Sequence, residues 1–219
     1  MKGLATIIFT CFLCLATSNA QDYVGISAGT SHYFGDLAKT TTPFSTGNTK
    51  AVVGVEYLKF VADRFYLGTA VNIGSLAADD LRSTIDSHRA RSYDFTTLIS
   101  ELQLQIGLDL LDYHLNNTST LKLRFSSGIA GIYCKTTHSN SELTSLVNEY
   151  ENSSKIGFSI PFNLSLDIDM NDVTYFIQGE GRKSFSDYLD GLSILTESAA
   201  NDTYGFIKLG ARIPINTSK

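Results

Sequence analysis

The residues of this sequence that could do chemistry are its histidines and its paired carboxylates. The histidines are His32, His88, His114 and His138, and each falls in or beside a different polar segment. None lies in a local nucleophile motif, although hydrolases built on Ser, His and acidic residues need these groups together. The spacing therefore favours a protein that is not an enzyme.

Two pairs of carboxylates lie close enough in sequence to be considered as metal ligands. They are Asp79 with Asp80, and Asp187 with Asp190. Carboxylates in polar surface segments are usually solvated, because water hydrates them and no bound metal ion is needed. We therefore expect no metal, no cofactor and no small-molecule substrate.

The beginning of the chain has the pattern of a secretory signal peptide. Lys2 precedes an apolar run from Leu4 to Leu15, and small residues in 16–20 precede a cut after Ala20. The apolar run is too short for a permanent membrane anchor. The sequence predicts an exported protein with a signal peptide at 1–20 and one barrel domain at 21–219.

The exported part of the chain is mildly acidic. The whole chain has a net charge of −5, and the loss of Lys2 makes it about −6. No basic patch is available to displace counterions, which argues against nucleic acid as a partner. Cys134 is alone once Cys11 and Cys14 leave with the signal peptide, so no intramolecular disulfide is expected.

The elements that must position the polar side chains are strands with two different faces. From Leu98 to Leu110 the even positions other than Ser100 are apolar, and most odd positions carry Glu, Gln or Asp. This period of two is that of a strand, whereas a helix would bury Gln103 among the leucines. The same alternation recurs along the chain. The predicted strands are 23–33, 51–60, 65–74, 98–110, 121–134, 155–168, 173–182 and 203–213.

The connections between the predicted strands alternate in length. Outer-membrane barrels have an even number of strands, short periplasmic turns and long outer loops. We therefore predict an all-β fold, an eight-stranded antiparallel up-and-down transmembrane β-barrel with short periplasmic turns and long outer loops. The short or intermediate connections are 61–64, 111–120 and 169–172, and the long ones are 35–50, 75–91, 135–154 and 183–202.

The polar faces of the predicted strands carry charges of both signs. Such charges are costly in hydrocarbon but can pair inside a barrel, and eight strands leave room only for side chains. We expect a filled interior, with Glu101 paired to Arg124 on the adjacent strand. The predicted interior charge network consists of Glu56, Glu101, Arg124, Glu180, Arg182 and Arg212, with Lys122 and Lys208 on the same faces.

A soluble lipocalin-like barrel is the alternative to a membrane barrel. It would hold the apolar residues inside, and alternation alone does not separate the two. The order of the connection lengths favours the membrane barrel. Aromatic residues near the strand ends are expected in interfacial girdles, namely Tyr23, Phe60, Phe65 and Tyr113 at the inner side, and Phe95, Tyr133 and Phe158 at the outer side.

Several motifs along the chain resemble one family of bacterial barrels. Tyr33–Leu37 contains Gly35, Asp36 and Leu37. The most specific motif, Glu180–Asp190, contains Arg182, Phe185, Asp187, Tyr188 and Asp190. The remaining motifs are Arg91–Phe95 leading into Glu101, Leu110–Tyr113, Ser159–Phe162 and Asn201–Tyr204. In this order they resemble the PorG-like outer-membrane barrels of Bacteroidetes, which are associated with the type IX secretion system.

The resemblance implies a non-enzymatic protein of the outer membrane, surrounded by lipid. PorG-like proteins are understood to contact the periplasmic ring of the secretion machine, so ring proteins are the implied partners. The alternative is a general eight-stranded surface barrel, an adhesin or envelope-stabilising protein that acts through its outer loops. Arg182 and Lys183 at the barrel mouth are expected to pair with Asp187 and Asp190 and to fold the last loop over the interior.

Overall fold

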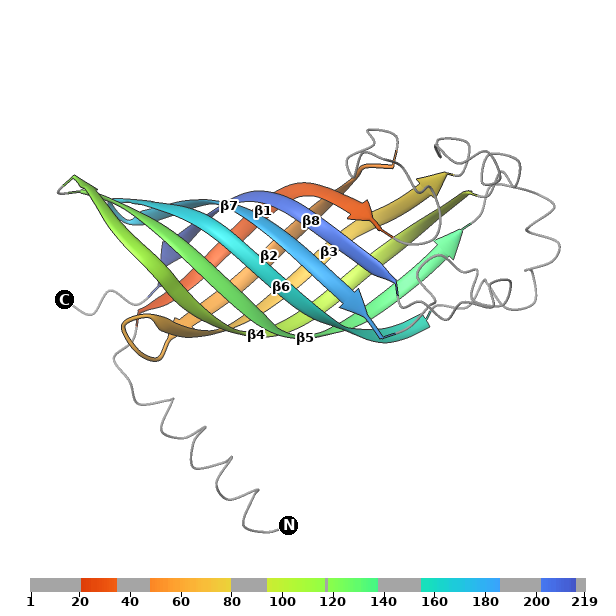
Figure 1. Ribbon diagram of the computed structural model, residues 1–219, viewed down its shortest axis with the longest axis horizontal. Coiled ribbons are helices and arrows are strands. Elements are labelled where there is room, and N and C mark those ends of the chain that lie inside the picture. The colour runs from red at the N-terminus through yellow and green to blue at the C-terminus, as the bar shows by residue number, and fades with distance from the viewer. Residues whose placement is uncertain are drawn as a thin grey trace, which may run out of the picture.

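Alternating side chains produce a strand in each predicted region, and the computed structural model closes these strands into a barrel (Figure 1). The structure describes residues 21–34, 48–79, 94–116, 118–137, 155–185 and 202–215, so the predicted signal peptide at 1–20 lies outside the described residues. Within these ranges no helix is long and apolar enough to cross a membrane. The strands are β1 Asp22–Tyr33, β2 Lys50–Phe60, β3 Phe65–Asp79, β4 Asp94–Asn116, β5 Ser119–Thr137, β6 Lys155–Met170, β7 Val173–Ser184 and β8 Thr203–Pro214.

Each strand pairs antiparallel with its neighbours in sequence, and β8 pairs with β1. Ile26 of β1, for example, faces Val55 of β2 on one side and Ala211 of β8 on the other. Closure leaves no open sheet edge along the body of the barrel, so its backbone groups are paired. The predicted fold, a closed antiparallel barrel of eight strands, is confirmed.

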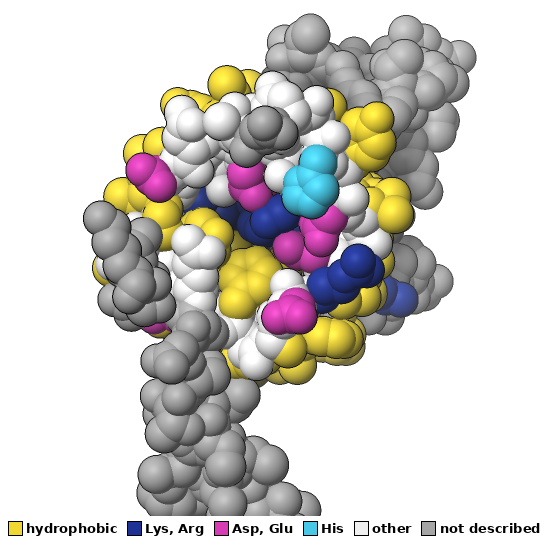
Figure 2. Space-filling model, turned by 90° about the vertical axis from the view of Figure 1, so that its left-hand side faces the viewer, with side chains coloured by type: hydrophobic (Ala, Val, Ile, Leu, Met, Phe, Trp, Pro, Cys, Tyr) yellow, Lys and Arg dark blue, Asp and Glu magenta, His cyan; other side chains and the backbone are white. Residues whose placement is uncertain are grey.

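The two faces of the barrel wall differ in polarity. On β4, Leu104 is 59% exposed and Ile106 is 65% exposed, whereas the intervening Gln105 is buried. Seen from the end with the short turns, charged side chains gather in the middle and hydrophobic side chains surround them (Figure 2). A lipocalin-like barrel has the opposite arrangement, with its apolar side chains inside.

The predicted short connection at 61–64 is confirmed, and the one predicted at 169–172 is shorter than predicted, because β6 continues to Met170. The β6–β7 turn consists of Asn171 and Asp172, and Asn171 has a φ of 56°, a left-handed conformation that Asn tolerates and that two-residue hairpin turns require. In the β2–β3 connection the amide of Val61 donates to the carbonyl of Phe65 at 2.9 Å. These turns lie at the end of the barrel where β1 begins and β8 ends (Figure 1).

The predicted connection at 111–120 is wrong. β4 continues to Asn116 and β5 begins at Ser119, so the two strands form a long hairpin with a tight turn. The ladder shifts register between Asp109 and Leu111, because one extra residue bulges out of β4. After the bulge the odd positions face outward, whereas before it the even positions do. A search for one continuous alternation therefore ends at the bulge and assigns the rest of the strand to a polar connection.

The predicted aromatic girdles are only partly correct. Tyr23, Phe60 and Phe95 point into the barrel, because they share the inward phase of their strands. The rings of Tyr23 and Phe60 are 5.7 Å apart, and Phe95 is 1% exposed. At the end with the long connections, the interior is therefore closed by an apolar cluster that includes Val52, Leu76, Phe95, Ile99, Ile132, Tyr204 and Phe206. Phe65, Tyr113, Tyr133 and Phe158 are exposed on the outside.

Candidate functional site: the charged barrel interior

Every residue of the predicted charge network points into the barrel and is buried. The residues are Glu56, Glu101, Arg124, Glu180, Arg182 and Arg212. They come from β2, β4, β5, β7 and β8, and each has the inward phase of its strand. The structure brings them together in two separate clusters.

The motif residues of the resemblance are described only in part. Phe185 follows β7, is exposed, and donates its amide to the carbonyl of Phe158 at 2.9 Å. Gly35, Asp36, Leu37, Asp187, Tyr188 and Asp190 lie outside the described residues, and so do the expected contacts of Asp187 and Asp190 with Arg182 and Lys183.

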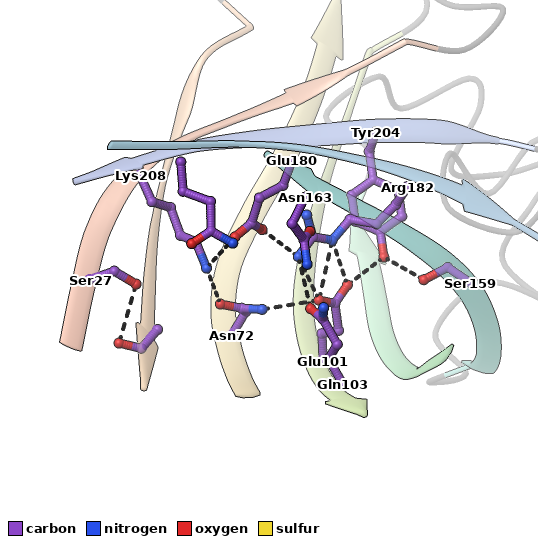
Figure 3. Close-up of polar contacts among 12 residues, drawn as sticks. Ser27, Asn72, Glu101, Gln103, Ser159, Asn163, Glu180, Arg182, Tyr204 and Lys208 are labelled. Atoms are coloured by element: carbon purple, nitrogen blue, oxygen red, sulfur yellow. Dashed lines mark hydrogen bonds and ion pairs between the residues drawn. The ribbon is translucent and has the colours of Figure 1, made fainter. Parts of the chain in front are cut away.

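The first cluster lies nearer the long connections, and we call it the loop-end cluster (Figure 3). It consists of Asn72, Glu101, Glu180, Arg182, Tyr204 and Lys208. Arg182 donates from Nε to Glu101 Oε2 at 3.0 Å and from Nη2 to Glu101 Oε1 at 2.9 Å. Tyr204 donates to Oε2 at 2.8 Å, and Asn72 donates to Oε1 at 3.0 Å. The buried carboxylate of Glu101 is therefore surrounded by donors.

Lys208 and Glu180 complete the loop-end cluster. The Lys208 ammonium lies 2.7 Å from Glu180 Oε1 and donates to Asn72 Oδ1 at 2.8 Å. Glu180 Oε2 lies 2.5 Å from Arg182 Nη2. Two carboxylates thus face two cations, so the cluster has no net formal charge. The guanidinium of Arg182 also lies over the ring of Phe206, 4.2 Å from its centroid, a favourable cation–π position.

The second cluster lies nearer the short turns, and we call it the turn-end cluster. It consists of Glu56, Asp109, Arg124, Asp167 and Arg212. Arg124 lies 2.7 Å from Asp109 Oδ1 and 2.8 Å from Asp167 Oδ2. Arg212 also contacts Asp167, and its Nε lies 2.6 Å from Glu56 Oε1. Asp167 therefore bridges two arginines from different strands.

A layer of neutral polar side chains fills the space between the two clusters. Gln105 Oε1 accepts from Gln103 at 2.9 Å, from Ser126 at 2.9 Å and from Asn163 at 3.0 Å. Gln103 also contacts Arg182 at 3.4 Å, which connects this layer to the loop-end cluster. Side chains thus occupy the barrel along its length.

The predicted pairing of Glu101 with Arg124 is wrong. Across the β4–β5 ladder Glu101 faces Ile132, and Arg124 faces Asp109. Glu101 binds Arg182 of β7 instead, on a strand that does not pair with β4. Alternation specifies the face of a residue but not its register with the next strand, so it could not specify the partner.

Sequence reasoning also missed several members of the clusters. Asp109 and Asp167 have the inward phase of β4 and β6, so the alternation does place them inside. Asn72 and Tyr204 are neutral, and a search for charges passes over them although both donate to Glu101. What indicates all four residues in the sequence is their position on the inward face of a strand, and not their residue type.

The histidines and possible metal ligands among the described residues are dispersed. No group of three His, Cys, Asp or Glu among them could hold a metal ion. His32 lies near the end of β1, with its Nε2 3.1 Å from Thr30 Oγ1. His114 lies at the other end of the barrel, with its Nδ1 3.0 Å from Thr120 Oγ1. His88 and His138 lie outside the described residues. The charged side chains of the two clusters pair with one another inside the barrel.

Comparison with known proteins identifies a family and a set of similar barrels. A family model described as "Domain of unknown function (DUF6089)" matches residues 2–212. No curated protein matches the chain in sequence. The structure of Ail from Yersinia pestis, in complex with the heparin analogue sucrose octasulfate, has 9% identity and a TM-score of 0.48, and the match covers 90% of this chain and 99% of that chain.

Two further solved structures are similar to the same extent. Neisserial surface protein A has 11% identity and a TM-score of 0.48, with 90% of this chain and 97% of that chain covered. The N-terminal β-barrel domain of Pseudomonas aeruginosa OprF has 11% identity and a TM-score of 0.45, with 89% of this chain and 99% of that chain covered.

Proposed function

The chain belongs to the DUF6089 family of domains of unknown function, and we propose that it is a non-enzymatic outer-membrane barrel of the type IX secretion system that anchors the periplasmic ring. The observation that carries the proposal is the inverted polarity of the barrel, apolar outside and ion-paired inside. The remaining support is the resemblance of its motifs to PorG-like barrels.

The outward face is suited to hydrocarbon. Large apolar side chains cover it on every part of the wall, and a soluble monomer rarely exposes a contiguous apolar surface of this size. The residues include Ile26, Val55, Ile73, Leu104, Ile129, Leu164, Ile177 and Leu209, one from each strand. A bilayer removes this surface from water, and closure of the barrel satisfies the backbone there.

The filled interior argues for a role in anchoring. Ligand barrels and channels keep a cavity or a lumen, whereas here the two charge clusters and the layer around Gln105 occupy the space. A protein of this kind works through its ends. The short-turn end faces the periplasm in barrels of this topology, so a periplasmic partner meets the turns and the β4–β5 hairpin.

The membrane part of the proposal is tested by fractionation and gel mobility. We expect the protein in the outer-membrane fraction. We also expect it to migrate faster on a detergent gel before boiling than after, because a closed barrel stays folded in detergent until it is heated. A soluble protein whose mobility does not depend on heating would contradict it.

The secretion part is tested separately in a strain that lacks the gene. Cargo proteins of the type IX system are expected to remain inside the deletion strain and to return to the medium after complementation. Normal secretion without the gene would leave the general surface barrel, acting through its outer loops, as the function.

A further inference from the structure

The β4–β5 hairpin extends beyond the rest of the barrel wall at the short-turn end (Figure 1). β4 has 23 residues, whereas a tilted strand crosses the hydrocarbon core with about 9–11 residues. Its ladder with β3 ends at the pair Phe65 and Leu108, and the amide of Asp109 donates to the carbonyl of Arg64 at 2.8 Å. From residue 110 onward β4 pairs with β5 alone.

The projecting part of β4 is a free strand edge. Among the residues that the structure describes, no strand pairs with 110–116 on the side that β3 occupies elsewhere. All seven side chains of this segment are exposed, and it contains no Pro or Lys. The ladder with β5 shifts register at both ends of the segment, between Asp109 and Leu111 and between His114 and Asn116, so the regular part of the edge is 111–114. A strand edge without a pairing partner recruits another strand.

The chirality of the strand identifies which backbone groups face the free edge. The side chain of Asp109 points inward, and its amide points to the β3 side. In an L-polypeptide strand, side chains on one face always have their N–H groups on the same side. Asp112 and His114 pair with Lys122 and Thr120, on the inward face, so their amides and carbonyls point to the free edge.

The side chains along the edge alternate in character. Leu111, Tyr113 and Leu115 lie on the outward face, at 63%, 66% and 51% exposure. Asp112 lies on the other face opposite Lys122, whose ammonium is bound to Asp169 at 2.7 Å. A strand that pairs with this edge therefore meets apolar side chains at every second position and a carboxylate between them.

A second copy in the same membrane does not fit this edge. Barrel strands are tilted by about 35–45° from the barrel axis. Two copies related by an axis along the membrane normal would bring their β4 edges together crossed, at about twice that tilt, whereas strand pairing needs nearly parallel or antiparallel strands. A strand from a periplasmic protein has no such constraint.

We infer that the β4 edge at 111–114 binds an extended segment of a periplasmic protein by β-strand addition. The segment has apolar residues at alternate positions and a basic residue opposite Asp112. Backbone hydrogen bonds supply the affinity, and the alternating side chains supply the specificity. The inference rests on the periplasmic orientation of the short turns in the proposed function.

The test is photocrosslinking in cells from the centre of the edge. The photoreactive residue p-benzoylphenylalanine replaces Tyr113, and the same residue at lipid-facing Leu209 is the background control. The expected result is an adduct from position 113 alone, with a partner peptide that mass spectrometry maps to an alternating apolar segment containing Lys or Arg. An adduct with a second copy of this chain, or no protein adduct, would overturn the inference.

Two matched pairs of variants test the mode of binding. His114→Pro removes an edge donor and is expected to lower the adduct about tenfold, whereas His114→Ala keeps the amide and the adduct. Asp112→Lys is expected to lower the adduct more than Asp112→Asn. Heat-dependent gel mobility shows whether each variant folds. If the proline variant does not fold, the Asp112 pair alone tests strand addition. Equal yields within the pairs would overturn strand addition. An edge-dependent adduct with normal cargo secretion in the deletion strain would refute the proposed secretion role and leave this inference standing.

Discussion

Arg182 of β7 and Glu101 of β4 join two strands that do not pair with each other. Their two hydrogen bonds, at 3.0 and 2.9 Å, cross the interior of the barrel. The ion pair forms only when the wall between these strands is in place. Closure of the barrel and formation of the interior ion pair are therefore coupled, so a change in either side chain should affect the stability of the whole barrel.

Replacing Glu101 with Leu should strongly destabilise the barrel. The change leaves Arg182 buried with Glu180 as its remaining carboxylate, and loss of one partner of a buried ion pair costs about 3–5 kcal/mol. Urea unfolding of the refolded protein, followed by heat-dependent gel mobility, measures the change in free energy.

The control for Glu101→Leu is Leu104→Ile on the same strand. Leu104 faces outward, and the substitution conserves its volume, so it should cost less than about 1.5 kcal/mol. Equal folding yields for the two variants would count against the inward position of Glu101.

Tyr204→Phe should have a smaller effect than the loss of Glu101. It removes the 2.8 Å hydrogen bond to the buried Glu101 carboxylate, a type of bond that contributes about 1.5–3 kcal/mol, together with a longer contact of 3.4 Å with Ser159 Oγ. Tyr57→Phe is the matched control, because its hydroxyl donates at 2.9 Å to Asp22 from a partly exposed position. If unfolding in urea responds equally to both variants, Tyr204 is not part of a cooperative buried cluster.

The sequence specifies the wall of this barrel better than its interior. The phase of the alternation places Glu101, Arg124 and Arg182 inside, because strand side chains have a period of two. The partner of Glu101 depends on register and on the curvature that brings β7 toward β4, and no local pattern encodes either. The β4–β5 hairpin was missed for a related reason, since one bulged residue reverses the phase.

A side chain at Gly107 is expected to destabilise the barrel. A Cβ built there would lie 2.0 Å from Cζ of Tyr66, a buried ring that covers the glycine from the adjacent strand. Gly107→Ala forces that ring to move and should cost about 1–3 kcal/mol. Gly131→Ala is the control, because a Cβ there meets nothing within 4 Å. Comparable unfolding midpoints for the two alanine variants would show that Tyr66 does not pack against Gly107.

The purified barrel should not conduct ions. The loop-end cluster, the layer around Gln105 and the turn-end cluster fill successive levels of the interior, and an ion would have to displace paired charges at two of them. Such pairs are held by several hydrogen bonds each, so thermal opening of both clusters at once is rare. In planar lipid bilayers the protein should give no steady current, whereas a large open porin under the same conditions conducts. A reproducible single-channel conductance from the native protein would mean that these side chains leave the lumen.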